Sequence, residues 1–404
     1  MSHRVAIAGA DVAFDCESGQ SVLDAALKAG IELPHSCRKG VCGSCVGMIA
    51  SGEVAGVNGA ATTNETCLPG QVLLCTCTPV GDVVLQPMVW KRLDPTARKT
   101  FHAKVHGNTL AAPDVSVLKL RLPLGQRAKF QAGQYLQVAM DDGSTRSYSM
   151  ANPPHESDSV TLHIRHVPGG WFSARVGALK PGDQLKIELP FGNVALQDGD
   201  TRPIVFVVGG TGFAPVKSIL DDMAKRRVQR PITLVWGARE PGGLYLLDAV
   251  ERWKKQWPDL RFIPALSDVP DGTMAGAFAG RVDQALQAHC ASLAGHVVYC
   301  CGSPPMVTAV RNAAQAAGLA PADFHADVFV PGPAAAAACT RTRRQTWCAA
   351  QSDMARRMAA ARPSETVPLA DTAKPPAGCS PCSAPAAAAA YQGHRSGMAA
   401  AAGR

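Results

Sequence analysis

The sequence predicts a multidomain fold: an α+β domain, an antiparallel β-barrel and a parallel α/β sheet, followed by a disordered C-terminal tail. Three observations support it. Closely spaced cysteines near the N-terminus lie among short strands and one helix, which indicates a small domain around a metal-binding loop. The middle of the chain alternates apolar stretches with turn signals such as Asp141-Asp142-Gly143, which is typical of a barrel. Farther on, apolar strands alternate with helices, which is typical of a parallel sheet.

Composition limits the classes of function. The chain has 404 residues, 47% of them hydrophobic, which is enough for several domains with cores. Without a long apolar run or a signal peptide, we expect a cytoplasmic protein with no membrane contact. The net charge is +8, but residues 334–404 hold nine Lys/Arg and three Asp/Glu, which leaves +2 for the remaining residues. We therefore expect no nucleic-acid partner.

The first domain is predicted over residues 1–92. Val5–Ile7 and Val12–Phe14 have the composition of short strands joined at a glycine turn. A helix is expected over Val22–Ala29, because Ser21 with Asp24 three residues later forms a capping-box pattern. Two further strands are expected: Val46–Ala50 and Val83–Gln86.

Three cysteines of this domain, Cys37, Cys42 and Cys45, have C-x4-C-x2-C spacing, and Cys75 follows later. This is the plant-type spacing for a 2Fe–2S cluster held by four thiolates. Structural zinc fits less well, because zinc sites usually pair two C-x2-C units and only Cys42 and Cys45 have that spacing. Plain reduced thiols are the other alternative. The fourth ligand stays open between Cys75 and two neighbours: Cys67 and Cys77. Residues 1–88 resemble the plant-type ferredoxin fold.

Residues 87–99 have no clear periodicity and are expected to form a linker. A barrel domain is then predicted over residues 99–199. Its expected strands include Val115–Leu122, Tyr135–Ala139, Ser159–His166 and Gln184–Glu188.

Two barrel segments carry polar groups suited to a phosphate-bearing ligand. They are Arg146–Asn152, which contains R-S-Y-S, and His163–Ser173, which contains a glycine pair. Guanidinium and clustered N–H groups bind phosphate. Both segments resemble the flavin site of the ferredoxin–NADP reductase superfamily, which implies bound FAD. By this resemblance Tyr148 packs on the isoalloxazine, Ser149 reaches its reactive edge and Arg146 meets the diphosphate. The other implied contacts are Met150, His163, Arg165, Gly169, Gly170 and Ser173.

A nucleotide-binding α/β domain is predicted over residues 200–332. Pro203–Val208 is a continuous apolar strand, and a glycine turn and a helix to about Arg226 follow it. Such a turn points N–H groups at a pyrophosphate. The residues of this motif are Gly209, Gly210, Thr211, Gly212 and Pro215. Strands are expected next at Ile232–Trp236, Arg261–Ala265, Val297–Cys301 and Phe324–Phe329, with helices at Leu246–Gln256, Val282–Ala288 and Pro304–Ala317.

Two further segments resemble motifs of the same superfamily. Tyr299–Met306 is similar to a C-G-x-P-x-M segment that closes over the nicotinamide. This implies Cys301 near the hydride path, Gly302 for close approach and Met306 as a helix anchor. His325–Phe329 is similar to a D-x-F ending, which implies that Phe329 covers the flavin ring. The alternatives are a buried strand-end cysteine at Cys301 and a core aromatic at Phe329.

Together the domains resemble NAD(P)H-dependent iron–sulfur flavoprotein reductases. The resemblance implies electron transfer from NADH through FAD to a 2Fe–2S cluster and on to a partner, a terminal oxygenase, a hydroxylase or another acceptor protein. The alternatives are a reductase of CDP-linked deoxysugar biosynthesis, a free-standing flavin or ferric reductase and a zinc-stapled binding module. NADPH is the alternative donor, because Arg239 suits a 2′-phosphate while Glu240 suits a hydroxyl. The Ala-, Arg- and Pro-rich residues 333–404 are expected to be disordered.

Overall fold

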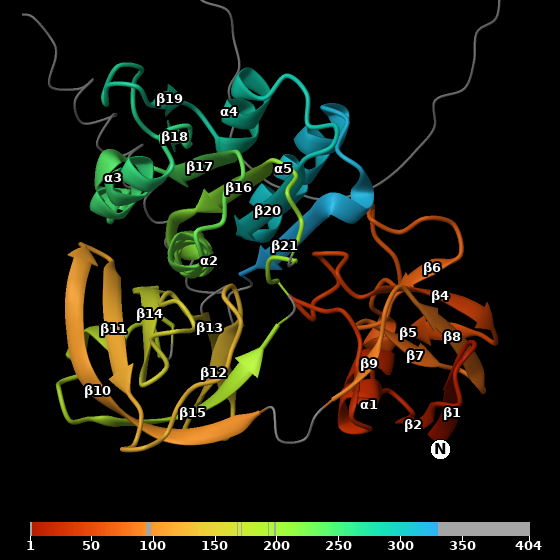
Figure 1. Ribbon diagram of the computed structural model, residues 1–404. Coiled ribbons are helices and arrows are strands. Elements are labelled where there is room, and N and C mark those ends of the chain that lie inside the picture. Colours follow the sequence, from red (N-terminus) through yellow and green to blue (C-terminus); the bar gives the residue numbers. More distant parts are fainter. Residues whose placement is uncertain are drawn as a thin grey trace, which may run out of the picture. The chain divides into compact units, whose positions relative to one another are not determined.

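A computed structural model describes residues 2–93, 98–167, 169–170, 172–192, 194–197 and 199–329 (Figure 1). The predicted tail, residues 333–404, lies outside these ranges. All described residues belong to one compact unit of the chain. Within the described ranges, no helix is long and apolar enough to cross a membrane.

The N-terminal domain is a mixed five-stranded sheet with one helix against it. The sheet order is β2 (Ala13–Glu17), β1 (Ser2–Ile7), β8 (Val83–Pro87), β4 (Val46–Ser51), β6 (Gln71–Leu73). Helix α1 (Val22–Lys28) begins as predicted, because Ser21 Oγ accepts a hydrogen bond of 3.1 Å from the Asp24 N–H. Its apolar side chains Val22 and Leu23 are fully buried against the sheet. The α+β expectation for this domain is confirmed.

Two small ribbons complete the domain. They are β3 (Ile31–Glu32) with β9 (Lys91–Arg92), and β5 (Val54–Gly56) with β7 (Cys77–Pro79), with the short 3-10 helix η1 (Val57–Gly59). The stretch over residues 87–99, expected to form a linker, also contains residues of the two neighbouring domains. Backbone pairing places Lys91–Arg92 on the edge of the first domain, and Lys99 already begins a barrel strand. Short strands of this kind carry no side-chain periodicity that a sequence pattern can reveal.

The second domain is a six-stranded antiparallel sheet that closes on itself. Its order is β13 (Thr145–Ser149), β12 (Tyr135–Ala139), β15 (Gln184–Phe191), β10 (Lys99–Ala112), β11 (Val115–Arg121), β14 (Ser159–Arg165), and η2 (Val176–Ala178) lies in a connection. A bridge between Met150 and Leu162 joins the two edge strands. Strand β10 is long and has register shifts near Val105/Gly107 and Leu110/Ala112, where the strand bends. The predicted barrel is confirmed.

The third domain is a parallel six-stranded sheet between two helical layers (Figure 1). The order is β19 (Phe278–Ala279), β18 (Arg261–Leu266), β17 (Ile232–Ala238), β16 (Ile204–Gly209), β20 (Val297–Gly302), β21 (Phe324–Val328). The helices are α2 (Phe213–Arg226), α3 (Leu247–Gln256), α4 (Val282–His289) and α5 (Pro304–Ala316), with short 3-10 turns η3 (Gly210–Gly212), η4 (Pro241–Gly243) and η5 (Pro321–Asp323). The chain leaves β16 toward β17 on one side and returns at β20 on the other. The carboxyl ends of β16 and β20 therefore form the point where such sheets bind ligands.

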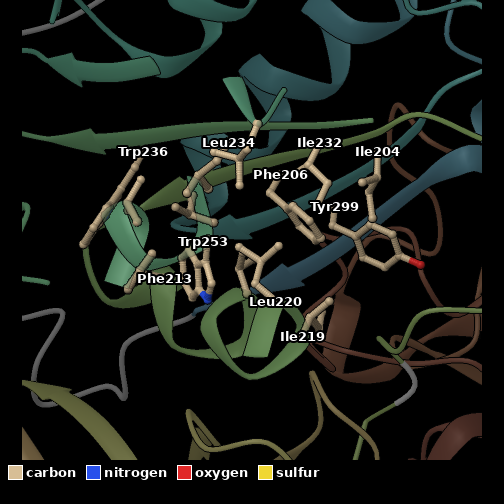
Figure 2. Close-up of a cluster of buried hydrophobic side chains, with 14 of the residues drawn as sticks. Ile204, Phe206, Phe213, Ile219, Leu220, Ile232, Leu234, Trp236, Trp253 and Tyr299 are labelled. Atoms are coloured by element: carbon tan, nitrogen blue, oxygen red, sulfur yellow. The ribbon is translucent and has the colours of Figure 1, made fainter. Parts of the chain in front are cut away.

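Aromatic stacking fixes α2 and α3 against one face of this sheet. Phe213 at the start of α2 stacks on Trp236 of β17 with ring centroids 3.8 Å apart, and Trp253 of α3 lies 5.7 Å from Phe213 (Figure 2). Phe206 and Leu234 are fully buried in the same cluster. Strand β16 is buried on both faces, because α4 and α5 cover Val205 and Val207 from the other side.

Candidate functional site

The cysteine loop turns its backbone amides toward its own sulfurs. The N–H groups of Lys39 and Cys42 each point at Cys37 Sγ at 3.4 Å, and the Ser44 N–H points at Cys42 Sγ at 3.5 Å. Gly43 allows the loop to turn, with φ of +71°, and a Cβ there would lie 2.3 Å from Thr66 Oγ1. Amides directed at sulfur in this way stabilise thiolates and raise cluster potentials.

The four candidate ligands form two pairs of thiols. A hydrogen bond between Cys37 and Cys42 lowers the pKa of Cys37 to about 6 and raises that of Cys42. A second one between Cys45 and Cys75 lowers the pKa of Cys75 and raises that of Cys45. In the part of the chain that the structure describes, no three His, Cys, Asp or Glu side chains converge on a single ion. A 2Fe–2S cluster held by four thiolates takes two of them at each iron, an arrangement with which two pairs of thiols are compatible.

The geometry supports Cys75 over its neighbours as the fourth ligand. Cys77 lies on β7, is fully buried in the domain core with Val5 and Leu85, and its burial raises its pKa to about 12. Cys67 lies in a loop and contacts Asn64 Oδ1 at 3.8 Å. Only Cys75 forms a pair with one of the three loop cysteines, Cys45. The assignment of the individual ligands stays a prediction.

The predicted flavin residues lie on β13 and on the segment after β14. Tyr148 packs against Phe172 with ring centroids 5.5 Å apart, and Arg146 is half-buried with Nη1 donating to the Thr145 carbonyl at 2.9 Å. Gly170 is buried beside Ser173, whose Oγ would lie 2.1 Å from a Cβ at that position. Gly169 has φ of +74°, which glycine adopts readily.

Three of the predicted contacts have other surroundings. Met150 is fully buried in the barrel core, so its side chain cannot face a ligand outside the barrel. His163 is buried against Tyr245, with Nδ1 at 3.1 Å from the hydroxyl, and burial lowers its pKa to about 3. The Arg165 guanidinium pairs with Asp114 and lies 3.1 Å from the position of a Cβ on Gly210. Arg165 of the barrel domain therefore lies beside the glycine turn of the third domain.

Close backbone packing at the ends of β16 and β20 explains the glycines of the nucleotide motifs. A Cβ on Gly212 would lie 2.1 Å from the Cys301 carbonyl oxygen. Cβ atoms on Gly209 and Gly302 would each lie 2.6 Å from Met306 Sδ, so Met306 fills the space between the two strand ends. The other two residues of the turn, Gly210 and Thr211, lie in η3, and Pro215 is buried in the first turn of α2.

Asp327 on β21 is a central residue that the motif comparison leaves without a role. Its Oδ2 accepts a 3.1 Å hydrogen bond from Ser149 Oγ, and its Oδ1 accepts one of 3.1 Å from Ser36 Oγ. Burial raises the pKa of Asp327 to about 6, against the opposing effect of both hydroxyls. One signal in the sequence was available: Asp327 is the only acidic residue of β21, whose other residues are Phe324, His325, Ala326 and Val328.

Residues from three of the predicted motifs lie around the Asp327 carboxylate. Ser36 directly precedes Cys37, Ser149 is the predicted flavin contact, and Cys301 pairs with Asp327 between β20 and β21. The Phe329 N–H donates to the Gly302 carbonyl at 2.9 Å, which fixes that aromatic residue beside the same strand end. Burial raises the pKa of the Cys301 thiol, so it remains protonated at neutral pH.

Comparisons with known proteins assign all three domains. Residues 5–80 match the 2Fe-2S iron-sulfur cluster binding domain, residues 102–196 the oxidoreductase FAD-binding domain and residues 206–312 the oxidoreductase NAD-binding domain. The expected cofactor-binding domains and their order are therefore confirmed. The first domain offers thiols for a cluster, and Arg146 and the turn at Gly210–Gly212 offer a guanidinium and N–H groups for phosphates.

Relatives align over most of the chain. Over 333 residues it is 61% identical to reductase component 2 of terephthalate 1,2-dioxygenase from Comamonas sp, with 82% of this chain and 99% of that protein covered. Over 332 residues it is 35% identical to the CDP-6-deoxy-L-threo-D-glycero-4-hexulose-3-dehydrase reductase of Yersinia pseudotuberculosis, with 82% and 99% covered.

A solved structure has the same architecture. The crystal structure of the Amycolatopsis cytochrome P450 reductase GcoB superimposes with a TM-score of 0.64 at 30% identity, covering 81% of this chain and 99% of that chain. The chain therefore belongs to the family of NAD(P)H-dependent iron–sulfur flavoprotein reductases, enzymes that combine a 2Fe–2S domain, an FAD-binding domain and an NAD-binding domain in this order.

Proposed function

We propose that this chain is the NADH-dependent reductase component of an aromatic-ring dioxygenase of the terephthalate type. The observation that carries the proposal is the 61% identity to a terephthalate 1,2-dioxygenase reductase component, along 99% of that protein's length. The 35% identity to a CDP-sugar dehydrase reductase is much lower over the same region. Relatives of both kinds align over the same part of this chain, and the higher identity to the dioxygenase reductase supports an oxygenase as the acceptor.

The buried hydrogen bonds around Asp327 support electron transfer within one chain. Asp327 connects Ser36, next to the first cluster ligand, with Ser149 at the predicted flavin edge. A flavin accepts two electrons together from a nicotinamide and releases them singly, as a one-electron centre requires. Ser149 and Asp327 are 7% and 8% exposed, and this burial excludes water from the place where reduced groups would meet.

In this proposal each domain contributes a defined set of groups. Tyr148 and Arg146 hold the flavin ring and diphosphate, and the Ser149 hydroxyl, which donates to Asp327, leaves its oxygen free to accept a hydrogen bond from a ligand. The turn at Gly210–Gly212 offers N–H groups to a pyrophosphate at the start of α2. Cys37, Cys42, Cys45 and Cys75 hold the cluster from which the oxygenase takes its electrons.

NADH is the proposed donor because of the residues after β17. Arg239 is largely exposed, and its Nε lies 3.9 Å from the Asp268 carboxylate, so an acidic side chain already faces the guanidinium. Glu240 comes next and suits a ribose 2′-hydroxyl. Comparing kcat/KM for the two nucleotides tests this choice, and a preference for NADPH would reverse it.

Reconstitution tests the proposed partner. The purified holoprotein is mixed with NADH, oxygen and the oxygenase component of a terephthalate 1,2-dioxygenase, and the dihydroxylated product is measured. Product formation that requires the reductase supports the proposal. The control is Cys42→Ser, which should still allow NADH to reduce the flavin but should give no product. Turnover only with a CDP-sugar dehydrase, and none with the oxygenase, would replace the proposed acceptor with the alternative.

A further inference from the structure

A buried arginine of the NAD-binding domain contacts the cysteine loop of the first domain. Arg311 lies on α5 and is 9% exposed, and its Nη2 donates a 2.5 Å hydrogen bond to the backbone carbonyl of Cys42. Cys42 is itself 2% exposed and packs into the apolar cluster formed by α5, β20 and β21. The guanidinium therefore lies at the loop that carries the candidate ligands, although its helix belongs to another domain.

The charge of Arg311 has no acidic partner in the described ranges of the chain. No carboxylate there lies within ion-pair distance of its guanidinium, whose other contact is the face of Phe324, 4.6 Å from the ring centroid. The nearby Glu65 is exposed and accepts a 3.3 Å hydrogen bond from Thr308, one turn earlier on α5. Glu65 lies beyond ion-pair distance, although its charge still acts on Arg311. An arginine stays protonated even when buried, so a further negative charge beside the guanidinium would stabilise it.

A 2Fe–2S cluster on the neighbouring cysteines would supply such a charge. Four thiolates and two sulfides give a 2Fe–2S centre a net negative charge, and its reduction adds one electron. A fixed positive charge close by stabilises the reduced form more than the oxidised form, and net charge is one of the factors that set cluster potentials.

We propose that the positive charge of Arg311, held beside the cysteine loop by its hydrogen bond to the Cys42 carbonyl, raises the reduction potential of the cluster on Cys37, Cys42, Cys45 and Cys75. The proposal rests on the ligand assignment given above. The cluster then becomes a better acceptor of the flavin's electrons while the first domain is packed against α5. Phe324 holds the guanidinium in place, because an arginine above an aromatic face is held by a cation–π interaction.

The test is a redox titration of the holoprotein followed by the EPR signal of the reduced cluster. Arg311→Gln keeps a hydrogen-bond donor but removes the charge, and we expect its midpoint potential to fall by about 59 mV, a tenfold change for a one-electron couple. Arg311→Lys keeps the charge and should stay close to the wild-type potential. The matched control is Thr308→Val, which removes the hydrogen bond to Glu65 from the same helix and leaves the charge unchanged. Its potential should equal that of the wild type.

Several results would overturn the proposal. If Arg311→Gln has the wild-type midpoint potential, the charge of Arg311 has no effect on the cluster. If the potential shifts equally in the Gln and Lys variants, the effect comes from packing and not from charge. If the Arg311→Gln protein lacks the cluster, the Arg311→Lys protein provides the test. A normal cluster and a normal potential in Arg311→Lys support the role of the positive charge, and loss of the cluster in that variant too contradicts it. A wild-type protein without a 2Fe–2S EPR signal would instead refute the ligand assignment, so the two failures are distinguishable.

Discussion

Ser149 Oγ lies 3.1 Å from Asp327 Oδ2, although 178 positions of sequence separate the two residues. The bond joins the end of barrel strand β13 to the last strand of the parallel sheet. Because the carboxylate accepts, the serine proton is fixed toward Asp327 and its lone pairs point elsewhere. The orientation of the hydroxyl at the predicted flavin edge therefore depends on a residue of the NAD-binding domain.

The first prediction concerns this hydroxyl. Ser149→Ala should slow reduction of the flavin by NADH at least tenfold, because a positioned polar group at the reacting centre is lost. Asp327→Asn should slow it less, since the hydroxyl remains but can reorient. Stopped-flow measurement of flavin bleaching gives the rates. Ser147→Ala on the exposed face of β13 is the control and should react like the wild type. Equal rates for Ser149→Ala and Ser147→Ala would remove Ser149 from the site.

The second prediction follows from the pKa of Asp327, which burial raises from 3.8 to about 6. Since the folded state binds this proton more tightly, its contribution to stability is greatest at low pH and is lost as the pH rises through about 6. Between about pH 5 and pH 7.5 the loss is about 1.4 kcal/mol in the free energy of unfolding. The Asp327→Asn variant has no ionisable group at this position, so its free energy of unfolding should not fall by this amount between the two pH values. Urea unfolding at both pH values measures it, and a difference between variant and wild type that does not change with pH would contradict the prediction.

The third prediction concerns the fourth cluster ligand. Cys75→Ala should abolish the visible and EPR spectra of the 2Fe–2S cluster and lower bound iron, because a four-thiolate site loses a ligand. Cys77→Ala is the matched control two residues away; as a core side chain it should keep the cluster and lose only stability, about 1–2 kcal/mol. Iron analysis of both proteins distinguishes them. Retention of the cluster in Cys75→Ala and its loss in Cys77→Ala would exchange the two assignments.

Local patterns in the sequence were sufficient to predict the domains and most of the strands. The cysteine spacing, the alternating barrel strands and the strand–glycine–helix turn each depend on residues close together in the chain. The contacts of Asp327 with Ser36 and of Arg311 with Cys42 join residues 291 and 269 positions apart, and no pattern in the sequence indicates such contacts. Side-chain direction is also hard to predict from a motif: Met150 belongs to the predicted flavin segment, but its side chain points into the barrel core, so its predicted contact with the flavin would have to come from its backbone.

The last prediction concerns Gly212, whose backbone has φ of −57° and ψ of −12°, so any residue could adopt its conformation. What excludes a side chain is space, because a Cβ would lie 2.1 Å from the Cys301 carbonyl oxygen, which is backbone and cannot rotate away. Gly212→Ala should therefore push the glycine turn from β20, destabilise the NAD-binding domain by about 1–3 kcal/mol and raise KM for NADH.

Gly242→Ala is the matched control for this change. It lies in η4, where a Cβ would meet nothing within 4 Å, so the thermal unfolding temperature and the KM should stay near the wild-type values. Calorimetry and steady-state kinetics on the two variants measure the difference. If Gly212→Ala matched Gly242→Ala in both measurements, close contact between the turn and β20 would not be what positions the N–H groups for a pyrophosphate.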